Sequence, residues 1–298
     1  MIEIKNLTKQ YGTYKAVNNL SFEVGDGKML GFLGVNGAGK STTINMLSTI
    51  LRQDGGEAII NGYALGKDDR KIRETIGVVY QQNVLDELLT VKENLSIRAR
   101  LARVEKRKFD SRLSELGELL NLEDILDKSY KVLSGGQKRR CEIAAALIHA
   151  PMVLFLDEPT TGLDPATRIE VWNAVKSLRE DKNMTVFLTT HYMEEAAAAD
   201  KIVIIDKGVK MAEGTPIDLK QKYARDRLKI YFDKENAEHI EGLLTRCDHN
   251  VTDYGAEIII ADSFEAIDIV GRIRPFIRGF EVIAGSMDDV FINVTKVV

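Results

Sequence analysis

A run of glycine, lysine and serine near the N-terminus has the residue types and the spacing of a phosphate-binding loop. It follows the pattern G-x-x-x-x-G-K-[ST] and reads Gly34-Val35-Asn36-Gly37-Ala38-Gly39-Lys40-Ser41. Because glycine adopts conformations that a Cβ hinders, successive backbone N–H groups can turn toward an anion. Lys40 can reach the β- and γ-phosphates, and the Ser41 hydroxyl can ligate Mg²⁺. We therefore expect a site for a nucleoside triphosphate and Mg²⁺ that extends to Thr42.

A phosphate loop requires a strand before it and a helix after it, and the residues on either side of residues 34–41 have both patterns. Residues 29–33 form a short apolar run, as in a buried parallel strand. Residues 41–47 read as the start of an amphipathic helix, whose positive dipole end would face an anion. A strand, a glycine loop and a helix in this order make a chance glycine turn a poor alternative.

Polar side chains follow two further apolar runs. Asp157 and Glu158 come directly after residues 152–156, and His191 comes shortly after residues 184–188. Because α/β sheets place ligands at the carboxyl ends of parallel strands, we expect these side chains beside the phosphates. One carboxylate can bind Mg²⁺ while the other orients or deprotonates water. An exposed acidic turn and a structural histidine are the alternatives.

The segment from Thr90 to about residue 130 is helical in pattern and rich in charge. Its basic residues could form a nucleic-acid patch, but acidic residues follow directly, so a solvated helix surface is favoured. The segment is followed by Ser134, Gly135, Gly136 and Gln137. The serine and glutamine form a capping box that starts a helix. Two glycines in a first turn weaken a helix, which suggests that an anion approaches the backbone there.

Composition describes an ordinary globular protein. The chain has 298 residues, a net charge of −4 and 44% hydrophobic residues, which does not suggest a binder of nucleic acid or of a membrane surface. No window approaches the ~18 apolar residues of a membrane span, and the N-terminus lacks a signal-peptide pattern. The two cysteines form no C-x-x-C motif. A cytosolic protein is the simplest expectation.

Taken together, these motifs resemble those of an ATP-binding-cassette (ABC) ATPase, the energy-coupling subunit of a transporter. The phosphate loop, the Leu133–Gln137 signature and the apolar run ending in Asp157-Glu158 have the order and spacing of that family. The signature is specific to this class of phosphate-loop proteins. The resemblance implies an α/β fold with a parallel-sheet core, an antiparallel β subdomain and a helical insertion at about residues 84–140. This domain is expected to cover residues 1–222.

The resemblance also implies a role for individual residues. Lys40 would hold the β- and γ-phosphates with the rest of the loop, and Ser41, Gln81 and Asp157 would serve Mg²⁺. Glu158 would polarise the attacking water, while His191 and Gln81 would contact or sense the γ-phosphate. Tyr11 would stack on adenine. Val35 stands where proline is more usual, with little effect expected because the loop depends on its glycines.

Only one phosphate loop and one signature occur, which in this family implies a dimer. Ser134, Gly135, Gly136 and Gln137 would close over ATP bound to the opposite protomer, and Asp164 would lie in the loop that crosses to it. The dimer could be a homodimer or a heterodimer. The resemblance implies a separate transmembrane permease as the partner, and this permease would hold the chain on the cytoplasmic face of the membrane. A nucleic-acid partner is not expected. A non-transport ABC ATPase acting on ribosomes or DNA is the alternative. The translation-factor branch carries two cassettes in one chain and the chromosome or repair branch carries long coiled coils, and the sequence shows neither pattern.

The tail resembles that of drug-exporter and multidrug-resistance ATPases, at residues 214–220 and 286–295. Between these segments the pattern predicts β-α-β-β-α-β, the order of a ferredoxin-like α+β domain. We therefore expect an accessory domain at residues 223–298, and export is favoured over import.

Overall fold

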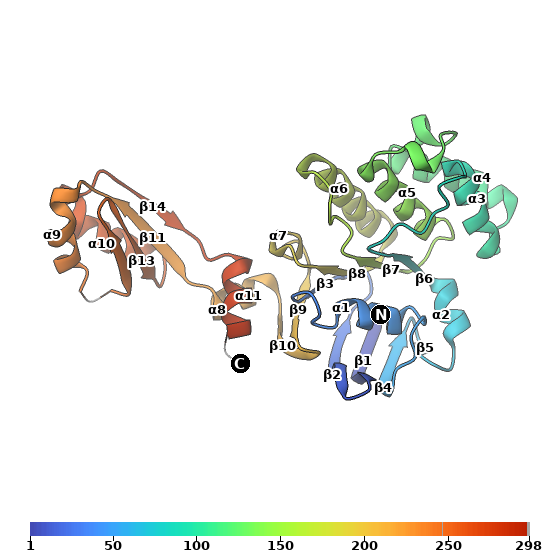
Figure 1. Cartoon of the computed structure of the whole chain (residues 1–298), viewed down its shortest axis with the longest axis horizontal. Coiled ribbons are helices and arrows are strands. Elements are labelled where there is room, and N and C mark those ends of the chain that lie inside the picture. The colour runs from blue at the N-terminus through green and yellow to red at the C-terminus, as the bar shows by residue number, and fades with distance from the viewer. Residues whose placement is uncertain (246, 297–298) are drawn as a thin grey trace. The chain divides into compact units, whose positions relative to one another are not determined.

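The computed structural model describes residues 1–245 and 247–296, without the side chains of residues 178 and 180–182. The chain forms two compact units, Met1–Thr215 and Pro216–Val298 (Figure 1). The division falls earlier than the expected boundary after residue 222. The reason is that helix α8 (Pro216–Tyr223) contacts helix α11 (Met287–Lys296) of the second unit, where Asn293 donates a hydrogen bond to the Tyr223 carbonyl oxygen.

A six-stranded sheet forms the centre of the first unit. Its strands are β3 (Met29–Leu33), β6 (Ile76–Val79), β7 (Val153–Asp157), β8 (Thr185–Thr190), β9 (Lys201–Asp206) and β10 (Val209–Gly214). Their order is β10-β9-β3-β8-β7-β6, and all pairs are parallel except that of β10 with β9. Every residue of β3, β7 and β8 is buried, which explains their uninterrupted apolar sequences. Because these three neighbours are parallel, the segments that follow them meet at one edge of the sheet.

An antiparallel sheet makes the second layer of this unit. It has the order β2-β1-β4-β5 and consists of β1 (Ile2–Tyr11), β2 (Tyr14–Val24), β4 (Gly55–Ile60) and β5 (Tyr63–Ala64). Aromatic rings join the two sheets, since Phe22 of β2 lies 5.5 Å from Phe32 of β3 and 6.1 Å from Phe187 of β8. The predicted parallel core and antiparallel subdomain are both confirmed.

Helices connect and cover the strands of the first unit (Figure 1). They are α1 (Lys40–Leu47), α2 (Asp69–Thr75), α3 (Val91–Leu101), α4 (Lys106–Leu119), α5 (Gly135–Leu147), α6 (Pro165–Lys182) and α7 (Met193–Ala196). Two short 3₁₀ turns, Glu123–Ile125 and Tyr130–Val132, precede α5. The segment from α3 to α5 lies between β6 and β7, so the helical insertion is confirmed. Both predicted capping boxes form, at Thr90 with Glu93 and at Ser134 with Gln137.

His149 follows α5 and gives the first unit a predicted sensitivity to acid. Its Nε2 lies 2.9 Å from the Ile76 carbonyl oxygen, and burial lowers its pKa below the usual 6.5. Below that value the unfolded chain binds a proton that the folded chain does not, so the free energy of unfolding falls as the pH drops. His149→Gln should lessen this fall, measured by thermal unfolding above and below the usual pKa with the fluorescence of the sole tryptophan, Trp172. Equal acid sensitivity in both proteins would contradict the prediction.

The second unit contains the predicted β-α-β-β-α-β order. Its elements are β11 (Asp226–Tyr231), α9 (Ala237–Leu243), β12 (His249–Thr252), β13 (Gly255–Ile260), α10 (Ser263–Ile273) and β14 (Gly279–Ile283), with 3₁₀ turns Lys234–Asn236 and Arg274–Phe276. The sheet order β12-β13-β11-β14 is antiparallel throughout, as in a ferredoxin-like fold. Leu228, Ile230, Ile258 and Ile260 pack in its own hydrophobic core with the two helices.

Across the described parts of both units, no helix combines the length and the apolar character needed to cross a membrane.

Candidate functional site

A pocket of about 440 Å³ lies over the phosphate loop. Its lining consists of Tyr11, Tyr14, Ala16, Asn36, Gly37, Gly39, Lys40, Ser41, Thr42, Gln81 and Glu158. The loop reaches this position through two left-handed residues, Gly37 with φ +85° and Gly39 with φ +107°. A Cβ on Gly39 would also lie 2.4 Å from the Ala16 carbonyl oxygen. Glycine is therefore required at Gly39 by both conformation and space.

Lys40 begins α1 and its side chain is buried, 4% exposed, beside the pocket. Its Nζ donates to the carbonyl oxygens of Gly34, at 2.8 Å, and Val35, at 3.3 Å. It also forms an ion pair of 3.2 Å with Oε1 of Glu158. A buried ammonium needs anionic or polar partners, and the loop carbonyls and Glu158 supply them.

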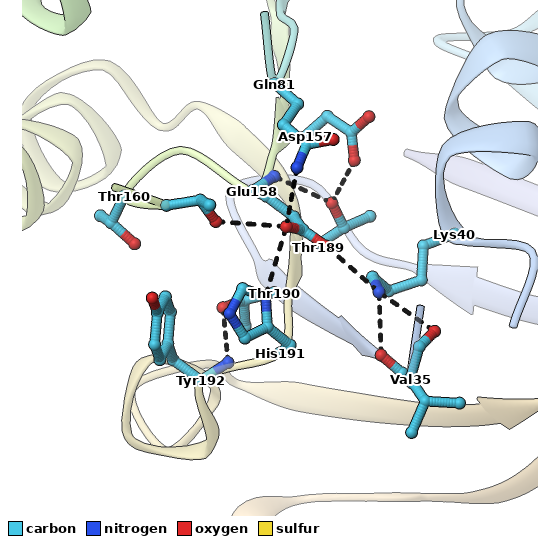
Figure 2. A network of polar contacts seen from close by, with 12 residues as sticks. Val35, Lys40, Gln81, Asp157, Glu158, Thr160, Thr189, Thr190, His191 and Tyr192 are labelled. Carbon is cyan, nitrogen blue, oxygen red and sulfur yellow. Dashed lines mark hydrogen bonds and ion pairs between the residues drawn. The ribbon is translucent and has the colours of Figure 1, made fainter. Parts of the chain in front are cut away.

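Glu158 is the centre of a buried polar network (Figure 2). Its Oε2 accepts hydrogen bonds from Gln81 Nε2 at 3.3 Å and Thr161 Oγ1 at 3.2 Å, and lies 3.2 Å from Nδ1 of His191. The imidazole nitrogen is buried but not aligned for a hydrogen bond. Glu158 itself has φ +46°, an uncommon conformation for a residue with a Cβ. Segments after β3, β6, β7 and β8 thus meet at this one carboxylate.

Asp157 ends β7 and is buried next to Thr189 of β8, whose Oγ1 donates to Oδ1 at 2.6 Å. The same hydroxyl oxygen accepts a hydrogen bond of 3.1 Å from the Glu158 backbone N–H. Thr189 therefore links both acidic residues to the neighbouring strand. This threonine was not among the residues expected from the sequence, because its only signal is a hydroxyl near the end of an apolar strand.

The pocket includes two aromatic side chains near the loop. Tyr11 is 50% exposed, so its ring is accessible, and stacking on adenine stays a prediction. Tyr14, 54% exposed, donates a hydrogen bond of 3.3 Å to the Gly37 carbonyl oxygen. Tyr14 and Ala16 were not expected at this site from the sequence, although both lie at the start of β2, close to Tyr11.

Of the signature residues, Ser134 caps α5, and Gly135, Gly136 and Gln137 lie in its first turn. Among the described residues that line the pocket, none belongs to this signature. The signature residues lie next to α6 instead: a Cβ on Gly136 would be 2.3 Å from Thr167 Cγ2. Asp164 caps α6, where its carboxylate accepts a hydrogen bond from the Thr167 N–H. Hydrogen bonds from the Thr167 side chain and backbone favour the ionised carboxylate and so hold the pKa of Asp164 below its usual value. The signature thus contributes no lining residue to the described pocket over the phosphate loop of its own chain.

Two family models match the chain. The ABC transporter model matches residues 17–161, and the C-terminal domain model of DrrA1-3-like ATP-binding proteins matches residues 214–295. The daunorubicin/doxorubicin resistance ATP-binding protein DrrA of Streptomyces peucetius is 38% identical over 99% of this chain and 92% of its own length. The linearmycin resistance ATP-binding protein LnrL of Bacillus subtilis is 39% identical over 76% of this chain and 73% of its own length.

Solved structures agree with this result. The first unit resembles a dimeric, post-hydrolysis state of the ATP-binding cassette MJ0796 bound to ADP and Pi, with a TM-score of 0.66 and 28% identity over 72% of this chain and 99% of that one. The ATP-binding subunit of an ABC transporter gives a TM-score of 0.69 with 29% identity over 75% of this chain and 93% of that one. The chain therefore belongs to the ABC transporter family, as an ATP-binding ATPase with a DrrA-like C-terminal domain.

Proposed function

We propose that this chain is the ATP-hydrolysing subunit of an exporter whose channel is a separate membrane-spanning protein. The observation that carries the proposal is the meeting of Lys40, Gln81 and His191 at the buried carboxylate of Glu158, beside the pocket over the phosphate loop. This arrangement supplies the Lys40 ammonium for the phosphates and a carboxylate for water in one place.

In the proposed reaction, the ion pair between Lys40 and Glu158 breaks when ATP binds, and Lys40 contacts the β- and γ-phosphates instead. Its release leaves Glu158 to accept a hydrogen bond from the attacking water, which orients the water toward the γ-phosphorus. His191 and Gln81 already lie at the same carboxylate, so both side chains are near enough to contact water or the γ-phosphate. Tyr11 stacks on the adenine ring.

The residues present fit Mg²⁺ by the chemistry of their donors. Ser41 and Gln81 line the pocket and offer a hydroxyl and an amide oxygen. Asp157 offers a carboxylate oxygen at the end of β7, directly before Glu158, and Mg²⁺ is bound through oxygen. When bound, the ion neutralises charge on the phosphates. Ser41, Gln81 and Asp157 are our proposed protein ligands.

A second protomer is needed to complete the proposed site. The signature residues Ser134, Gly135, Gly136 and Gln137 are separated from the pocket of their own chain, yet form a helix N-terminus suited to an anion. We propose that they close over ATP held by a partner cassette and that the Asp164 loop contacts the same partner. The dimeric state of the cassette MJ0796 supports this arrangement.

The exporter assignment is supported by relatives named for resistance to daunorubicin, doxorubicin and linearmycin. With this assignment we also propose that the permease holds the chain at the cytoplasmic face of the membrane. The test is affinity purification of the tagged full-length chain from detergent-solubilised cells. We expect one membrane protein in stoichiometric amount, and retention of ribosomes or DNA without a membrane protein would overturn the assignment.

A further inference from the structure

Arg139 is a buried cation in the second turn of α5, outside the motifs described above. Only 4% of the residue is exposed. Burial lowers the pKa of its guanidinium to about 10, so the group is still charged at neutral pH. A charge in this position requires polar partners, because leaving it unpaired in the interior would be costly.

Three backbone carbonyl oxygens supply those partners. Nη1 donates to Tyr80 at 2.5 Å, Nη2 donates to Asp157 at 3.2 Å, and Nε donates to Pro159. Tyr80 directly precedes Gln81, while Asp157 and Pro159 are the two neighbours of Glu158. One guanidinium thus holds the backbone on both sides of Glu158 and directly before Gln81.

The shape of the arginine side chain explains why this residue type is present. A guanidinium has five donors in a rigid planar fork, whereas the lysine ammonium is a compact charge on a flexible stem. The fork also restrains Glu158 near the uncommon φ of +46°, a conformation that persists only where surrounding contacts determine it.

Glu142, one turn further along α5, holds the other end of the Gln81 segment. Its Oε1 accepts hydrogen bonds from the N–H groups of Val84, at 2.8 Å, and Leu85, at 3.1 Å, and from the Tyr130 hydroxyl at 2.8 Å. Glu142 is 3% exposed. Helix α5 therefore holds both ends of residues 80–85 through two buried charges of opposite sign.

We propose that Arg139 is a positioning residue for ATP hydrolysis, which sets the place of Glu158 relative to Gln81 and ties both to the helix that begins with the signature. Ser134 caps α5, and Gly135, Gly136 and Gln137 lie in its first turn. A displacement of that turn by a partner protomer therefore moves the backbone on either side of Glu158. The inference rests on the proposed roles of Glu158 and Gln81. It adds an intrachain link between the signature and the hydrolytic groups.

The test compares Arg139→Lys and Arg139→Met with the unchanged full-length chain. Lysine keeps the charge but loses the fork, and the loss of hydrogen bonds from a charged donor predicts a kcat lower by about 10–100-fold. Methionine should lower kcat further. Affinity for ATP should change by less than about threefold, because the phosphate loop belongs to other elements and a threefold change is under 1 kcal/mol.

Arg140→Lys is the matched control. Arg140 is the next residue of the same helix, but its Nη1 donates to the carbonyl oxygens of Leu120 and Asn121, away from Glu158. The kcat of Arg140→Lys should stay within about twofold of that of the unchanged chain, which corresponds to a difference in activation free energy below about 0.5 kcal/mol. An unaltered kcat in Arg139→Lys would overturn the proposal. So would a loss of ATP affinity and thermal stability in proportion to kcat, because it would assign Arg139 to folding alone.

A double-mutant cycle with Gln81→Ala tests the link to Gln81. If Arg139 acts partly through Gln81, the double variant should lose less activity than the product of the two single losses. Strictly multiplicative losses would overturn this link. Glu158→Gln, measured in parallel, distinguishes a failure of the proposed function from a failure of the role of Arg139. If Glu158→Gln retains turnover, the proposed function fails. If Glu158→Gln is inactive while the Arg139 variants keep full activity, only the role of Arg139 fails.

Discussion

Glu158→Gln should retain ATP binding and lose turnover by about 10²–10⁴-fold, the contribution typical of a positioned group that transfers or orients a proton. The amide keeps the shape of the side chain, and its oxygen can still accept from Gln81 and Thr161. It removes the negative charge that the attacking water needs. It also removes the ion pair that holds Lys40, so this variant should bind ATP at least as tightly as the unchanged chain and accumulate as an ATP-bound dimer.

The measurements are phosphate release for turnover, equilibrium binding of ATP, and light scattering for the dimer. Glu194→Gln is a suitable control, because Glu194 is an exposed carboxylate on α7 and its replacement removes the same charge. Wild-type turnover in Glu158→Gln would contradict the assignment of Glu158 as the group that polarises water.

Lys40→Ala should weaken ATP binding by about 10–100-fold, corresponding to the loss of a hydrogen bond from a charged donor. Turnover should fall as well, since the β- and γ-phosphates are no longer held. Glu158 would meanwhile lose its buried cation, so thermal stability without nucleotide should also decrease. Titration with ATP and thermal unfolding in the absence of nucleotide measure the two effects.

Lys28→Ala is the control for the removal of a lysine. Its Nζ forms an ion pair of 3.6 Å with Asp200, but the side chain is 60% exposed, and such pairs contribute little to stability. We expect neither ATP affinity nor turnover to change. Equal ATP affinity and turnover in Lys40→Ala and the unchanged chain would contradict the proposed role of the phosphate loop.

Much of the fold could be predicted because its elements have strong local signals. The buried strands β3, β7 and β8 contain short, continuous apolar runs, which are typical of strands covered on both faces. The capping boxes fixed the starts of α3 and α5. By contrast, α8 and α11 were known only as tail motifs, and their mutual contact, which moves the unit boundary, joins residues far apart in the chain.

The sequence by itself determined the chemical groups of the site, because the phosphate loop, the Asp157-Glu158 pair and the signature are contiguous patterns with fixed spacing. Only the tertiary structure decided which of these groups meet. Lys40, Gln81 and His191 come from separate segments and converge on Glu158 because their strands are parallel neighbours in one sheet. Arg139 carries no motif of its own, and its importance follows from three carbonyl oxygens that the fold brings around it. Local spacing encodes a phosphate loop, but a contact between distant segments exists only once the chain has folded.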